Sequence, residues 1–188
     1  NDAKKVAEAF RQLGFDEVVE LYDKDASSRR LQQLLNDMLP RKVGRMDRLV
    51  LVYVGHAGVM QDSDGQDRGY LVPFDAPVTS TAKSITVEQL KEFARRSASK
   101  HTLLILDAPV VGWETTEPPR LSWEGQMAPE SDTERRAVQV VTAAGRGEAV
   151  GRSDQGSRFV EALLGGLSGA ADLDGNGWLM ASELGSYL

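Results

Sequence analysis

Residues 49–58 read LVLVYVGHAG. Six apolar residues, three of them valines, run without interruption into a glycine and then a histidine. A continuous run of this kind, rich in β-branched side chains and bounded by glycine, is typical of a strand buried on both faces of a parallel sheet. We therefore expect a buried strand over 49–54, with His56 just beyond its carboxyl end.

Two further runs of the same character follow along the chain. Residues 103–106 read LLIL and residues 138–141 read VQVV. Between the first two strands, the spacing of apolar residues over 87–98 predicts an amphipathic helix. Strands that alternate with helices indicate a parallel α/β sheet, so we expect one domain with a three-layer α/β/α fold.

The residues ahead of the first strand predict helices as well. Apolar side chains recur at helical spacing over 2–13, where Gly14 would end the helix, and over 27–39, where Pro40 would end it. Residues 18–21, between these helices, predict a short strand.

Composition excludes several classes of function. With 41% hydrophobic and 27% charged residues, the chain resembles an ordinary soluble protein, and we expect it in the cytoplasm with no membrane association. A net charge of −6 with interspersed Lys and Arg argues against nucleic acid as a partner. The chain contains no cysteine, which excludes disulfides, zinc thiolate sites and thiol catalysis.

Three segments that follow or flank the predicted strands carry a resemblance. They read YVGHAG (53–58), GYLVPFDA (69–76) and LILDAPVVG (104–112). In order and spacing they resemble three signatures of the caspase and metacaspase group of cysteine endopeptidases, which includes the bacterial orthocaspases. These signatures are aromatic-x-Gly-His-Gly, Tyr-Leu-x-Pro-x-Asp and Leu-Asp-x-Cys. The segment VQVVTA (138–143) is similar to the strand that opens the smaller subunit of that family.

The resemblance extends over the whole chain and implies its organisation. It implies a caspase-hemoglobinase fold with a mostly parallel sheet. It divides the single domain into a large-subunit-like part (1–111), an exposed linker loop (112–135) and a small-subunit-like part (136–188).

The family's mechanism implies roles for two positions. A histidine acts as general acid and base for a cysteine nucleophile, and His56 occupies the histidine position, although a histidine at a strand end is by itself more often structural. Pro109 occupies the position of the nucleophile. Proline has neither a thiol nor a backbone N–H, so both the attacking atom and one oxyanion donor are lost.

Two neighbouring residues also carry expectations. Ala57 stands in the oxyanion region where the family has glycine, and it would crowd that region if the backbone needs a positive φ. Asp107 matches an acid that lines the pocket for a basic substrate side chain in metacaspases, which implies binding of Arg or Lys peptides. The alternative for Asp107 is a structural aspartate that accepts hydrogen bonds in the turn after the strand.

Residues 172–183 read DLDGNGWLMASE and fit the twelve-residue EF-hand pattern. The pattern predicts calcium as a cofactor, and its expected ligands are Asp172, Asp174, Asn176, the backbone carbonyl of Trp178, and Glu183. The alternative is an Asp-rich turn that only caps the helix after it. A second acidic cluster, Asp62, Asp64 and Asp67, predicts a solvated loop, with a second cation site as the alternative.

In the family, an interior strand precedes the first helix, and none precedes Asn1. We therefore expect upstream residues in the native protein, or another segment, to fill that position. Three functions stay open: a pseudoenzyme that binds a peptide or protein partner, a cysteine endopeptidase whose cysteine was replaced, and a calcium-responsive interaction module. The sequence does not determine the oligomeric state.

Overall fold

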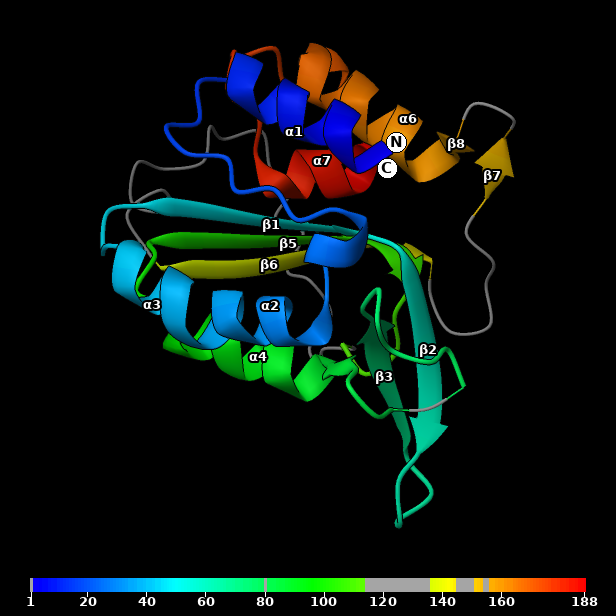
Figure 1. Cartoon of the computed structure of the whole chain (residues 1–188). Coiled ribbons are helices and arrows are strands. Elements are labelled where there is room, and N and C mark those ends of the chain that lie inside the picture. The colour runs from blue at the N-terminus through cyan, green and yellow to red at the C-terminus, as the bar shows by residue number, and fades with distance from the viewer. Residues whose placement is uncertain (1, 80, 114–135, 145–150, 154–155) are drawn as a thin grey trace.

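The computed structural model describes residues 2–79, 81–113, 136–144, 151–153 and 156–188. Its centre is a parallel sheet with strand order β1-β5-β6 (Figure 1). The strands are β1 (Arg48–Val54), β5 (His101–Pro109) and β6 (Ala137–Ala144). All three predicted strands are confirmed, and β5 and β6 extend beyond the predicted ranges.

Helices cover both faces of this sheet, as predicted for a three-layer fold (Figure 1). On one face lie α1 (Asp2–Gln12), α6 (Arg158–Gly165) and α7 (Ala181–Tyr187). On the other lie α2 (Ser28–Gln33), α3 (Leu39–Lys42) and α4 (Val87–Arg96). Alternate β5 residues enter the two cores: Ile105 packs with the first helix group and Leu104 with the second, and both side chains are fully buried.

A second, antiparallel sheet extends from the carboxyl end of β1. Its strands are β2 (His56–Gln61), β3 (Asp67–Val72) and β4 (Ile85–Thr86). These three strands were not expected from the sequence. A short hairpin of β7 (Arg152–Ser153) and β8 (Gly156–Ser157) precedes α6.

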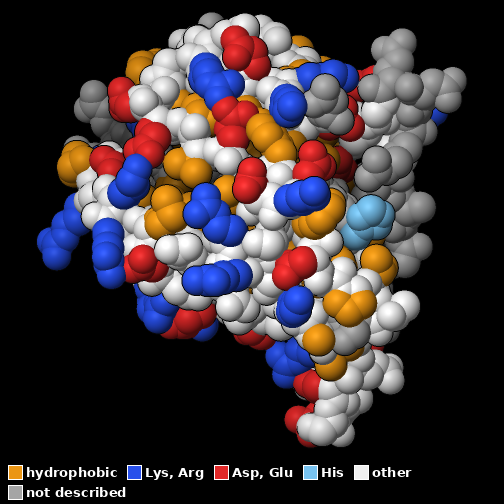
Figure 2. All heavy atoms as spheres, viewed as in Figure 1, with side chains coloured by type: hydrophobic (Ala, Val, Ile, Leu, Met, Phe, Trp, Pro, Cys, Tyr) orange, Lys and Arg blue, Asp and Glu red, His pale blue; other side chains and the backbone are white. Residues whose placement is uncertain are grey.

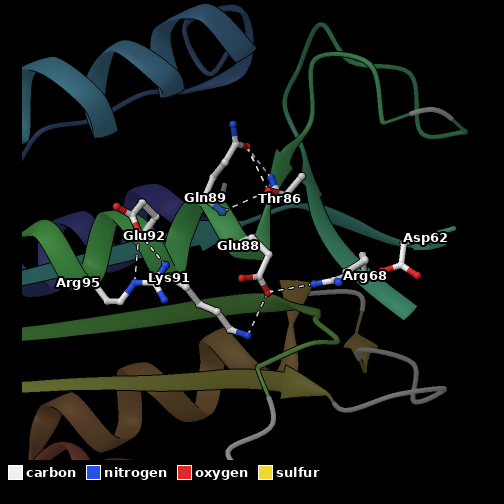
Figure 3. A network of polar contacts seen from close by, with 8 residues as sticks. All are labelled: Asp62, Arg68, Thr86, Glu88, Gln89, Lys91, Glu92 and Arg95. Atoms are coloured by element: carbon white, nitrogen blue, oxygen red, sulfur yellow. Dashed lines mark hydrogen bonds and ion pairs between the residues drawn. The ribbon is translucent and has the colours of Figure 1, made fainter. Parts of the chain in front are cut away.

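A chain of surface polar contacts joins the β2-β3 hairpin to α4 (Figure 3). Arg68 of β3 pairs with Asp62 at 2.8 Å and reaches Glu88 at 3.7 Å. The helix begins with a capping box, in which the Thr86 hydroxyl accepts from the Gln89 N–H at 3.2 Å and the Gln89 side chain accepts from the Thr86 N–H at 2.9 Å. The capping box fixes where α4 starts against the small sheet.

The second predicted helix does not end at Pro40. After α2 the chain forms a π-helical turn, η2 (Leu34–Met38), and then α3, in which Pro40 occupies the first turn. Proline is tolerated at the start of a helix because the N–H it lacks has no partner there. The wider π turn separates the proline ring from the preceding helix.

Two other expectations about the first sheet edge are wrong. Residues 18–21 form no strand. The strand β1 is half-buried along most of its length rather than buried on both faces, whereas β5 is almost entirely buried. The partial exposure follows from the position of β1, which is an edge strand of the described sheet and has no neighbouring strand on its outer side.

On the face seen in Figure 2, acidic and basic side chains are interspersed, and hydrophobic side chains reach the surface between them. Among the residues that the structure describes, no helix has both the length and the apolar character needed to cross a membrane.

Candidate functional site

His56 and Pro109 follow neighbouring strands and lie at the same edge of the sheet. The register pairs Val54 of β1 with Asp107 of β5, so His56 and Pro109 each lie two residues farther along the chain. The His56 side chain is exposed and Pro109 is half-buried. In α/β proteins, ligand-binding and catalytic residues usually lie at the carboxyl edge of the parallel sheet.

Tyr53 fixes the backbone at His56. Its hydroxyl oxygen lies 2.8 Å from the carbonyl oxygens of both His56 and Val72, and these two acceptors share its single proton. Burial raises the pKa of Tyr53 to about 12, so the hydroxyl stays protonated and remains a donor. Gly55 makes this contact sterically accessible, because a Cβ there would lie 2.7 Å from the Tyr53 hydroxyl oxygen. The first turn after β1 is therefore held against β3.

Pro109 coincides with an irregularity in the sheet. The register between β5 and β6 is regular up to Leu106, opposite Thr142, and shifts before Pro109, which lies opposite Ala144. Within sheets, proline is confined to edges and bulges because it has no ladder donor. The shift therefore places the residue without an N–H where the ladder is already interrupted.

Ala57 pairs with Leu71 inside β2 and packs against the core. Among the described residues, only Asp23 and Lys83 have a positive φ without being glycine. The backbone at Ala57 thus adopts a conformation that alanine tolerates, and the condition under which Ala57 would crowd the oxyanion region does not hold.

Asp107 lies beneath the surface, with 1% of its area exposed. Its Oδ1 accepts a hydrogen bond from the Ser157 hydroxyl at 2.9 Å. Ser157 is also the N-cap of α6, where its hydroxyl accepts from the Val160 N–H at 3.3 Å. The Asp107 carboxylate is therefore buried against Ser157 at the start of α6.

The N-terminal helix is attached to the same point. Oδ2 of Asp2 accepts from the backbone N–H of Ser157 at 3.0 Å. This hydrogen bond is the main reason why the pKa of Asp2 lies below its ordinary value. Asp2, Ser157 and Asp107 thus connect α1, α6 and β5 at the edge of the sheet that holds Pro109.

Gly69 allows β3 to approach the chain that leaves β5. A Cβ on Gly69 would lie 2.2 Å from the carbonyl oxygen of Val111. The small sheet is therefore seated directly against the segment that follows Pro109, which closes one side of the candidate site.

The loop over 172–183 brings its acidic residues together. Carboxylate oxygens of Asp172, Asp174 and Glu183 lie within 4.8 Å of one another, the one such cluster among the described residues. The loop also bonds internally: Oδ2 of Asp172 accepts from the Gly177 N–H at 2.9 Å, and Glu183 accepts from the Met180 N–H at 2.8 Å. The second contact is the one expected of a cap for α7. The geometry is therefore compatible both with a calcium site and with a turn that only caps α7.

The other two expected calcium ligands lie in the same loop. The Asn176 side chain accepts from the Trp178 N–H at 2.7 Å and donates to Asp174 at 2.7 Å. The Trp178 side chain is exposed.

The acidic cluster between β2 and β3 organises a turn. Asp62 accepts from the backbone N–H groups of Asp64 and Gln66, each at 2.9 Å, and from Arg68. The hydrogen bond from Gln66 is the largest cause of the lowered pKa of Asp62. This geometry favours the turn over a second cation site.

The sequence motifs single out His56, Pro109 and Asp107 as candidates, but they do not indicate the residues that position these side chains. The sequence does indicate a role for Ser157, because a serine directly before an apolar helical pattern predicts a helix N-cap. Its hydrogen bond to Asp107, fifty residues away, has no sequence signal. The predicted linker loop lies outside the described residues apart from its first two, Gly112 and Trp113.

Comparison with a protein-family model supports the fold. A family model described as the caspase domain matches residues 1–176. None of the curated proteins matches the sequence. Among solved structures, the chain is similar to protein GSU0716 from Geobacter sulfurreducens, with 19% identity and a TM-score of 0.48 over 57% of this chain and 39% of that one. A likeness this distant carries no argument about function. The match of the family model over most of the chain shows that the protein belongs to the caspase domain family.

Proposed function

We propose that this chain is a pseudoenzyme: a caspase domain that no longer cleaves peptides and serves as a binding or regulatory module. The observation that carries the proposal is Pro109, at the end of β5 beside the turn that holds His56. His56 alone would be a general base with no nucleophile to activate.

The chemistry of proline explains why activity is lost. In a measured serine protease, removal of the nucleophile lowers the rate by about 10⁶, and loss of one oxyanion donor costs roughly 10² to 10³ in other measurements. Pro109 removes both a nucleophilic atom and a backbone N–H. These losses do not add, but the loss of the nucleophile alone is large enough to abolish measurable turnover.

The partner we propose is a peptide or protein segment that binds across the edge formed by His56 and Pro109. By family resemblance it would carry a basic residue directed toward Asp107. Because Ser157 covers Asp107, such a residue reaches the carboxylate only if the start of α6 moves, and this supports weak or regulated binding rather than a permanently open pocket.

Turnover measurements on Arg- and Lys-containing fluorogenic peptides test the loss of activity. The purified chain should release no fluorophore with or without calcium. Hydrolysis that persists through purification to homogeneity and is lost in His56→Ala would contradict the pseudoenzyme. Binding of the same peptides, followed by calorimetry, should weaken in Asp107→Asn if this carboxylate receives the basic residue.

An alternative is an active endopeptidase of the family in which proline replaced the native cysteine. The encoded sequence of the natural protein distinguishes the two, because a cysteine codon at position 109 would support this alternative.

A second candidate function is calcium-responsive interaction through residues 172–183. It is favoured by the convergence of three carboxylates in a loop with the EF-hand pattern. Glu183→Gln distinguishes a calcium site from a turn that only caps α7. Glutamine can still accept a hydrogen bond from the Met180 N–H, but it has no negative charge and cannot coordinate calcium through two oxygens. Calorimetry should show calcium binding that disappears in Glu183→Gln and survives in Asp64→Asn, a control in the other acidic cluster. Absence of heat at millimolar calcium would exclude the calcium function.

A further inference from the structure

Asn176, followed by Gly177, lies in the exposed part of the loop over 172–183. These two residues contain the reactants of a cyclisation, because the backbone nitrogen after an asparagine can attack the side-chain amide carbon of that asparagine. Glycine hinders this attack least, since it has no side chain to shield its nitrogen. Gly177 has a φ of +79°, and a Cβ built on it would have no atom within 4 Å, so the nitrogen is accessible.

The loop polarises the amide group that this nitrogen would attack. The side-chain oxygen of Asn176 accepts a hydrogen bond from the Trp178 N–H at 2.7 Å. Negative charge develops on this oxygen when a nucleophile adds to the amide carbon, and a backbone N–H aimed at such an oxygen stabilises that charge. A second hydrogen bond, from the side-chain nitrogen to Asp174 at 2.7 Å, holds the amide in one orientation.

The loop also provides a proton acceptor for the attacking nitrogen. The Gly177 N–H donates to Oδ2 of Asp172 at 2.9 Å. A backbone amide nitrogen is a poor nucleophile until it loses its proton, and a carboxylate in hydrogen-bond contact can act as the general base. The base, the nucleophile and the donor that stabilises the oxygen therefore lie together in one short loop.

We propose that Asn176 is a site of self-catalysed deamidation, in which the loop over 172–183 converts its own asparagine to aspartate or isoaspartate. The Gly177 nitrogen forms a bond to the side-chain carbon of Asn176 while its proton passes to Asp172. The bond to the side-chain nitrogen then breaks, and this nitrogen takes up the proton and leaves as ammonia. Water opens the resulting succinimide at either carbonyl, so the net reaction is hydrolysis of one amide.

The conversion changes the charge of the loop in one direction only. Position 176 gains a carboxylate, which makes the chain one unit more negative than its net charge of −6. The hydrogen bond that Asn176 donates to Asp174 is replaced by two carboxylates that face each other, and like charges at this separation repel. The proposal does not depend on the pseudoenzyme or on calcium, because it uses no residue of the sheet edge and no cation.

Position 64 offers a matched comparison within the same chain. Asp64 also precedes a glycine of positive φ, Gly65 at +76°, and both residues are exposed. Asp64→Asn therefore creates a second asparagine–glycine pair in a turn. There the Gly65 N–H donates to a backbone carbonyl at 3.0 Å, and the N–H of Gln66 donates to Asp62 at 2.9 Å rather than to the side chain at position 64. The second pair thus has the same two residues without the base or the oxyanion donor.

The experiment incubates the Asp64→Asn protein at neutral pH in EDTA and follows each asparagine by tandem mass spectrometry. Both pairs share one molecule, so folding and solution conditions are identical for them. We expect position 176 to convert at least about ten times faster than position 64, and Asn36, which lies in η2 and precedes no glycine, to stay unconverted. Equal rates at positions 176 and 64, or no conversion at position 176, would overturn the proposal.

A second variant tests the base. Asp172→Asn keeps an oxygen that can accept the Gly177 N–H but cannot take its proton. We expect conversion at position 176 to slow by about tenfold or more relative to the unmodified chain. Fragment masses distinguish positions 172 and 176, and circular dichroism checks that the variant remains folded. An unchanged rate would contradict the role of Asp172 and with it the self-catalysed mechanism.

Discussion

Ser157→Ala tests the connection beneath the candidate site. The substitution removes a hydroxyl that donates to buried Asp107 and also caps α6. Leaving a buried acceptor without its donor costs about 1–3 kcal/mol, and loss of an N-cap costs about 1 kcal/mol. Because Ser157 is fully buried, water cannot replace the lost donor, and we expect a loss of about 2–4 kcal/mol in the free energy of unfolding. For a chain of this size, the melting temperature should fall by about 4–16 °C.

Chemical denaturation measured by circular dichroism provides the assay, with Ser186→Ala as the matched control. The Ser186 hydroxyl donates only to an exposed carbonyl in α7, at 2.9 Å, so its removal should cost less than about 0.5 kcal/mol. In a double-mutant cycle with Asp107→Asn, the two substitutions should be non-additive by about 1 kcal/mol or more. Equal stabilities of the Ser157 and Ser186 variants, or strict additivity in the cycle, would refute the coupling.

Two further substitutions test the framework of the site. Gly69→Ala should destabilise the fold by about 1–3 kcal/mol in urea unfolding, because its Cβ would meet the Val111 carbonyl at 2.2 Å, whereas Gly44→Ala, with 3.5 Å to its nearest atom, should be nearly neutral. Asp75 accepts the Ser28 N–H at the start of α2 at 2.7 Å, and this bond is the main cause of its lowered pKa. A carboxyl group whose folded pKa is depressed stabilises the protein above its unfolded pKa of about 3.9 and loses that contribution as the pH falls through the folded value. Asp75→Asn should therefore flatten the acid side of the stability profile below about pH 4, and an unchanged profile would argue against this role.

The order of elements was predictable because long apolar runs carry a strong signal. The strands at 49–54, 103–106 and 138–141 are continuous in the sequence, and each is present. The antiparallel sheet was missed because β2 and β3 are short and contain glycines at positions 58 and 69. Those glycines weaken the strand pattern but are required by close contacts with Tyr70 and Val111.

Some features of the candidate site depend on neighbouring residues in the sequence, and others depend on residues far apart in the chain. The expectations for His56 and Pro109 rest on local signals, because each follows a strand and stands in a recognisable motif. The burial of Asp107 was not predictable, since it depends on Ser157, which a separate helix brings into place. The strand expected at 18–21 is absent although the outer edge of β1 has no partner among the described strands, so the local apolar pattern alone did not determine the structure of this segment.

The most direct test of the pseudoenzyme is the rate at which three proteins hydrolyse an Arg-containing fluorogenic peptide: the unmodified chain, Pro109→Cys, and Pro109→Cys with His56→Ala. Cysteine restores both a thiol and a backbone N–H at the end of β5. We predict turnover in the single variant alone, with the unmodified chain and the double variant at background. Turnover by the unmodified chain at a rate comparable to that of the cysteine variant would contradict the claim that Pro109 abolished catalysis.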